Sequence, residues 1–92
     1  MAAAPKKDDL KARFEAATVA AKKTKKKPDN ATLLKLYASY KQATDGDVAW
    51  ARPGGLDFVG GAKHDAWSKL KGTSRDDAMQ SYIKLVEKLN RD

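Results

Sequence analysis

The stretch YASYKQAT at residues 37–44 decides the fold class and points to a binding surface. At about 100° per residue of a helix, Tyr40 and Lys41 lie roughly 60° and 40° to either side of Tyr37. Leu33 and Leu34 continue this strip toward the N-terminus. The spacing predicts a helix at roughly residues 29–45 that carries two phenol rings and an ammonium group on one narrow face. Such a face suits a ligand with an anionic end, a flat ring and an apolar tail.

Three further segments have the apolar periodicity of helices, and they predict helices at roughly residues 8–24, 61–71 and 74–91. The clearest start signal is the spacing of Ser74 and Asp77, which is that of a helix-capping arrangement. No segment alternates with period two for long enough to predict a strand. The predicted fold class is therefore all-α.

Between the second and third predicted helices the chain lacks periodicity and is rich in glycine and proline. We expect a long ordered loop at residues 46–61, because an irregular segment of this length in a compact domain is uncommon and usually functional. The expected anchors of this loop are four apolar side chains: Val48, Trp50, Leu56 and Phe58.

The 92 residues carry no internal repeat, which predicts a single domain over residues 1–92. Cysteine is absent, so disulfides and thiol chemistry are excluded. No apolar run approaches the roughly 20 residues of a membrane span, and the N-terminus lacks the hydrophobic stretch of a signal peptide. We therefore expect a soluble cytoplasmic monomer. The net charge of +7 favours an anionic partner: nucleic acid, an acidic membrane surface or a phosphorylated small molecule.

No group of residues predicts catalysis, so the chain is not expected to be an enzyme. His64 has neither a cysteine nor a second histidine with which to bind a metal, and no metal or cofactor is expected. The acidic pair Asp76 and Asp77 is explained by its place in the first turn of a helix. The glycine pairs at residues 54–55 and 60–61 lack the spacing of a phosphate-binding loop.

The lysine-rich run at residues 22–27 could contact nucleic acid or a membrane, although cations at a helix C-terminus are also favourable when they are only solvated. Lys22 differs from the other lysines because it lies one position beyond the apolar stripe of the first predicted helix. Its side chain could therefore turn toward a ligand or surface that this stripe contacts. Two alternatives to a small-ligand site follow: a basic helical module that binds nucleic acid, and a peripheral membrane-surface protein.

Several short motifs, in their order and spacing, resemble those of the acyl-CoA-binding protein family, the small cytosolic carriers of long-chain fatty acyl coenzyme A thioesters. The resemblance runs from Phe14 to Leu89. The motifs are YASYKQAT at residues 37–44, GDV at 46–48, RPG at 52–54, LDF at 56–58, AK at 62–63, DAW at 65–67, LKGTS at 70–74 and DAM at 77–79.

The resemblance implies an up-down-down-up bundle of four helices with a long connection between the second and the third. It also implies a long-chain acyl-CoA ligand, with the coenzyme A head in a surface bowl and the acyl chain in an apolar groove. Intracellular transport and storage of acyl-CoA would be the function, with transient contacts to membranes or to enzymes that use acyl-CoA, and without nucleic acid as a partner.

Position by position, the resemblance implies a role for each matching residue. Tyr37 would bond a phosphate or the head group, Tyr40 would stack on adenine, and Lys41 would pair with the 3′-phosphate of the ribose. Lys63 would neutralise the same phosphate, and Tyr82 would reach the ribose end. The other implied contacts are Ala38 and Ser39 in the ligand site, Lys22 near the thioester, and Ala17, Ala21, Leu33 and Leu34 in the acyl groove.

The chain departs from the family pattern at several positions, and two of them, Ala21 and Thr24, are commonly filled by larger aliphatic residues. His64 stands where many members have a tryptophan, and Val59 and Gly61 occupy positions that are often basic. Trp50 replaces a small polar residue in the long loop. The departure at His64 bears on packing near the adenine, and those at Val59 and Gly61 bear on the positive charge near the phosphates.

Overall fold

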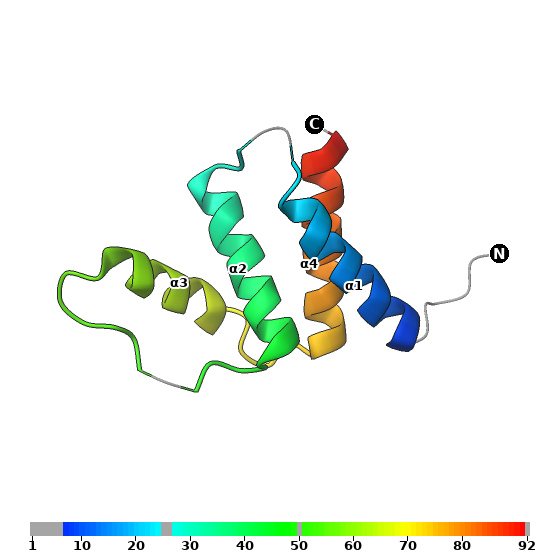
Figure 1. Ribbon diagram of the computed structural model, residues 1–92. Coiled ribbons are helices and arrows are strands. Elements are labelled where there is room, and N and C mark those ends of the chain that lie inside the picture. The colour runs from blue at the N-terminus through cyan, green and yellow to red at the C-terminus, as the bar shows by residue number, and fades with distance from the viewer. Residues whose placement is uncertain (1–6, 25–26, 50, 92) are drawn as a thin grey trace.

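A computed structural model of the protein describes residues 7–24, 27–49 and 51–91, and this part of the chain contains four helices and no strand (Figure 1). The helices are α1 (Lys7–Ala21), α2 (Asn30–Thr44), α3 (Phe58–Ser68) and α4 (Arg75–Arg91). They run up, down, down and up, so the predicted all-α bundle is confirmed.

Helix α2 is the centre of the arrangement. It packs against α4 on one side and α3 on the other, and α1 packs against α4 (Figure 1). The core lies where α1, α2 and α4 meet, because their apolar residues recur at helical spacing and each large side chain that is buried contributes about 1.5 to 3 kcal/mol. Its buried members are Leu10, Phe14, Ala17, Leu36, Ala43, Ala78, Tyr82, Ile83 and Val86.

Capping side chains start α2 and α4. Asp29 accepts a hydrogen bond from the backbone N–H of Thr32 (2.8 Å) at the start of α2. The hydroxyl of Ser74 accepts one from the backbone N–H of Asp77 (3.0 Å) at the start of α4, which confirms the S-x-x-D prediction. At the other end of α2 the chain turns at Gly46, whose φ of +83° is a conformation that favours glycine.

Helix α3 begins earlier than predicted, at Phe58 rather than near residue 61, and ends at Ser68. The carboxylate of Asp57 caps it by accepting a hydrogen bond from the backbone N–H of Gly60 (2.8 Å). A side chain on Gly60 would collide with this carboxylate, and one on Gly61 would come within 2.7 Å of the Arg52 guanidinium. The two glycines that suggested a turn therefore lie inside the helix, where they leave room for polar neighbours.

The predicted anchoring of the loop by Leu56 and Phe58 is wrong. These side chains are 87% and 75% exposed, whereas Val48 is half-buried and Trp50 lies outside the described residues. Polar contacts hold the connection instead. Arg52 pairs with Asp65 of α3 (Nε to Oδ1, 3.0 Å), so the loop is tied to the helix that follows it.

Within the described residues no helix combines the length and the apolar character that a membrane crossing requires.

Candidate functional site

One face of α2 carries the side chains that the sequence placed together. Leu33 and Tyr40 are 40% and 41% exposed, and Tyr37, which lies between them on the same face, is half-buried. We refer to Leu33, Tyr37, Tyr40 and Lys41 as the α2 stripe. Its rings and aliphatic groups remain partly accessible although they lie on the packed central helix, so another molecule can contact them there.

Helix α3 brings a second cation to the stripe. The Nζ atom of Lys63 lies 5.2 Å from the centre of the Tyr37 ring, a distance at which an ammonium group is attracted to the aromatic face. Lys63 reaches Tyr37 because α3 packs along α2. A phosphate that reached Lys63 would meet the Tyr37 ring beside it.

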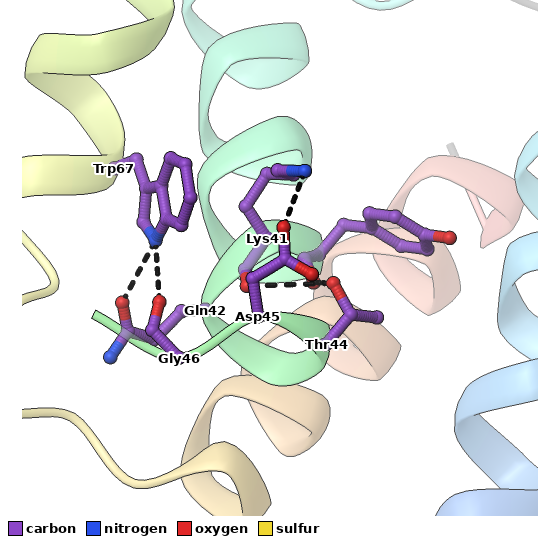
Figure 2. A network of polar contacts seen from close by, with 7 residues as sticks. Lys41, Gln42, Thr44, Asp45, Gly46 and Trp67 are labelled. Carbon is purple, nitrogen blue, oxygen red and sulfur yellow. Dashed lines mark hydrogen bonds and ion pairs between the residues drawn. The ribbon is translucent and has the colours of Figure 1, made fainter. Parts of the chain in front are cut away.

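Lys41 also turns toward α3. Its Nζ atom lies 5.3 Å from the centre of the Trp67 ring and 2.6 Å from Oδ2 of Asp45, one turn further along α2 (Figure 2). The hydrogen bond with Asp45 raises the pKa of the Lys41 ammonium, and the same bond lowers the pKa of the Asp45 carboxyl. Lys41 is thus fully charged at neutral pH, and an acidic neighbour holds it in place.

Tyr40 belongs to an aromatic cluster formed by α1, α2 and α4. Its ring centre is 5.8 Å from that of Phe14 in a stacked arrangement and 6.1 Å from that of Tyr82, and Phe14 meets Tyr82 edge-on at 5.2 Å. Tyr82 is buried, and this burial raises the pKa of its phenol. The structure therefore places Tyr82 behind Tyr40, in the core rather than on the open surface.

Two apolar cavities lie along the contact between α2 and α3, and Leu34 borders both. One, of ≈320 Å³, includes the predicted site residues Ala38 and Ser39 in its lining. The other, of ≈310 Å³, is lined at the start of α3 by Phe58, Val59 and Ala62. Leu34 thus lies beside space that an apolar chain could fill.

The remaining predicted residues lie elsewhere. Ala17 is buried in the contact between α1 and α4, where it lines a cavity of ≈270 Å³ with Ile83 and Val86. Ala21 is half-buried against the same core, and Lys22 is exposed just beyond the end of α1. The structure therefore does not place the α1 residues beside the cavities that Leu34 borders.

Sequence reasoning missed a buried polar network at the C-terminal end of α2. Gln42 donates from Nε2 to Asp47 and to the backbone oxygen of Thr73, both at 2.8 Å, and accepts from the Trp67 indole at 3.1 Å. The indole also donates to the backbone oxygen of Gly46 at 2.8 Å (Figure 2). Helical spacing from Ala38 and Ser39 places Gln42 on the buried side of α2, and this was the available signal.

Asp47 makes the fold sensitive to acid. The backbone N–H of Gly72 (2.9 Å) and the Gln42 amide donate to its carboxylate and lower the pKa of Asp47. A depressed native pKa contributes stability above the unfolded pKa, and this contribution is lost as the pH falls through the native pKa. We expect Asp47→Asn to unfold at a lower denaturant concentration than the wild type at neutral pH, with the difference shrinking below pH 4.

Denaturant titrations across the acidic range would measure this difference. The pKa values of Asp29 and Asp45 are also lowered, so the variant should keep part of the acid dependence. A gap between the two proteins that stayed constant from neutral to strongly acidic pH would contradict the role given to the Asp47 carboxylate.

His64 lies on α3, where it contacts Ser68. It is half-buried, and its Nδ1 atom lies 3.3 Å from the hydroxyl of Ser68 one turn away. The described ranges of the chain contain no cluster of histidine, cysteine and acidic residues that could hold a metal ion.

A model of the family described as acyl-CoA-binding protein matches residues 11–86 of this chain. The chain belongs to the acyl-CoA-binding protein family. An acyl-CoA-binding protein from Dictyostelium discoideum is 46% identical over 76 residues, which cover 83% of this chain and 90% of that protein. The acyl-CoA-binding protein homolog of Drosophila melanogaster is 47% identical, with 83% and 88% covered.

The same family has the same fold in solved structures. The crystal structure of acyl-CoA-binding protein 2 from Oryza sativa matches with a TM-score of 0.85 at 38% identity and covers 89% of this chain and 91% of its own. As a member of this family the chain binds acyl-CoA and is a binding protein rather than an enzyme.

Proposed function

We propose that this protein binds long-chain fatty acyl-CoA with the coenzyme A head against the α2 stripe and Lys63. The observation that carries this proposal is the Nζ atom of Lys63 above Tyr37, on a stripe whose Leu33 and Tyr40 remain partly exposed. Fixed cations and accessible apolar surface meet there, and acyl-CoA is a ligand that needs both.

The head group would use the cations and the phenol rings. Lys41 and Lys63 pair with the 3′-phosphate of the ribose, and each charge-assisted bond contributes roughly 1.5 to 3 kcal/mol. Tyr37 bonds a phosphate through its hydroxyl, and Tyr40 stacks on the adenine. Tyr82 is buried and packs against the Tyr40 ring. A contact between Tyr82 and the ribose end would therefore come from behind that ring.

The acyl chain would leave the head group toward the N-terminal end of α2. Leu33 supplies exposed apolar surface there, and Leu34 borders the two cavities between α2 and α3. Ala17, Ala21 and Lys22 of α1 remain contacts that the family resemblance implies, near the thioester and along the groove, although Ala17 faces α4 in this structure. The burial of methylenes supplies most of the affinity, at about 0.8 kcal/mol each before ordering costs.

In this proposal the protein is a monomeric cytoplasmic carrier that keeps a pool of acyl-CoA. It would exchange its ligand during transient contacts with membranes or with enzymes that use acyl-CoA, and it would not bind nucleic acid. Binding to DNA or RNA would fall steeply as salt is raised, so a salt series distinguishes that alternative from the carrier.

Replacing Lys41 with alanine should weaken the binding of palmitoyl-CoA by about tenfold, because one charge-assisted bond to phosphate is lost. Isothermal titration calorimetry would measure the change. Lys84→Ala is the matched control, since it removes the same charge from an exposed position on α4. Equal affinities of the Lys41→Ala variant and the wild type would remove Lys41 from the site, and a wild-type protein that failed to bind palmitoyl-CoA would end the proposal.

A further inference from the structure

The carboxylate of Asp45 lies beside the ammonium group of Lys41, and the proposed site depends on the charge of that ammonium group. The two groups are 2.6 Å apart (Nζ to Oδ2), and the side chains are 25% and 44% exposed, so both remain accessible to a ligand (Figure 2). The Lys41 ammonium thus has an anion beside it before any phosphate arrives.

The backbone holds this carboxylate in place. The Asp45 N–H donates to the carbonyl oxygen of Lys41 (2.7 Å), and the carbonyl of the next residue, Gly46, accepts from the Trp67 indole. The chain is therefore fixed on both sides of Asp45. Rotation of the Asp45 side chain or of the Lys41 side chain is then needed to separate the carboxylate from the ammonium group.

The helix dipole does not explain an acidic residue at this position. Asp45 is the C-cap of α2, where the partial negative charge of the helix end disfavours a carboxylate. Helix α4 follows the favourable arrangement, with acids in its first turn and Lys88 and Arg91 in its last. The positive charges that lower the pKa of Asp45 are Lys41 and, more weakly, Arg75.

We propose that Asp45 sets the affinity of the protein for acyl-CoA by competing with the ligand phosphate for the ammonium group of Lys41. This inference rests on the proposed function, because it requires Lys41 to bind a phosphate. A phosphate that approaches Lys41 must either displace the carboxylate or share the ammonium group with it. Either process makes binding weaker than Lys41 alone would allow.

Asp45→Asn should therefore bind palmitoyl-CoA about two- to fivefold more tightly than the wild type. The size is modest because exposed ion pairs are weak and screened. The gain should shrink as salt is raised, and it should be absent when Lys41 is also replaced by alanine. Asparagine preserves the shape of the side chain, and circular dichroism would check that the helices are intact.

Calorimetric titration of palmitoyl-CoA into four proteins tests the inference: the wild type, Asp45→Asn, Lys41→Ala and the double variant. Glu87→Gln is the charge-matched control, since it removes one exposed carboxylate from the α1–α4 side of the protein. The control should bind like the wild type. A comparable gain in Glu87→Gln would mean that only net charge matters, and this would overturn the inference.

The outcomes separate the inference from the proposed function. If Lys41→Ala weakens binding but Asp45→Asn leaves it unchanged or weaker, the competition is refuted and the site stands. A gain from Asp45→Asn that persists without Lys41 also refutes the competition. If Lys41→Ala has no effect, the placement of the phosphate at Lys41 fails, and the role of Asp45 fails with it.

Discussion

Replacing Gln42 with alanine should lower the free energy of unfolding by about 3 kcal/mol, the largest effect on stability that we expect from a single polar side chain in this protein. Gln42 is 1% exposed, and its amide makes three hydrogen bonds to partners outside α2. The variant would lose these bonds and the packing of the side chain, and it would leave the Thr73 carbonyl without its Gln42 partner. Urea denaturation followed by circular dichroism would measure the change.

The chain offers a matched control for this experiment. Gln80 is an exposed glutamine on α4, and Gln80→Ala should change the free energy of unfolding by less than about 0.5 kcal/mol. Because the Trp67 indole keeps its bond to Gly46, the Gln42 variant should still fold. Equal stabilities of the two variants would show that the network does not hold α3 and the connecting loop to α2.

Local signals explain why most of the helical architecture could be predicted. The caps at Asp29 and Ser74 act on backbone groups three residues away, so their effect can be recognised in the sequence itself. The start of α3 has the same kind of local cap, because Asp57 bonds the backbone N–H of Gly60 three residues on, but the two glycines that follow have the usual signature of a turn and hid this signal. Only the folded chain shows that a side chain at either glycine would meet Asp57 or Arg52.

In the candidate site, too, some features follow from local sequence patterns and others only from the folded chain. Helical spacing alone placed Tyr37, Tyr40 and Lys41 on one face, and the family resemblance paired Lys63 with them. The i, i+4 spacing of Lys41 and Asp45 was also visible, but the folded chain was needed to show that the two groups touch. The bond from Gln42 to Thr73 joins residues 31 apart in sequence, and no local pattern indicates such a contact.

The affinity for acyl-CoA should increase with the length of the acyl chain until the groove is filled. Each methylene that becomes buried contributes about 0.8 kcal/mol, so each two-carbon extension should strengthen binding by up to about tenfold. Ordering of the flexible chain reduces this gain. From free coenzyme A to palmitoyl-CoA we therefore expect an increase of about a thousandfold or more, which exceeds the effect of any single cation.

A series of saturated thioesters from four to eighteen carbons would show where the gain stops. The plateau should mark the length that the apolar surface beside Leu33 and Leu34 can cover. An affinity that did not depend on chain length would be inconsistent with an apolar groove, even if the coenzyme A head were bound as we propose.

The most direct test of the account is a calorimetric comparison of three ligands: palmitoyl-CoA, coenzyme A and palmitate. The α2 stripe with its neighbouring cavities offers apolar surface and cations together, so palmitoyl-CoA should bind far more tightly than either of its halves. Coenzyme A that bound as tightly as palmitoyl-CoA would contradict this.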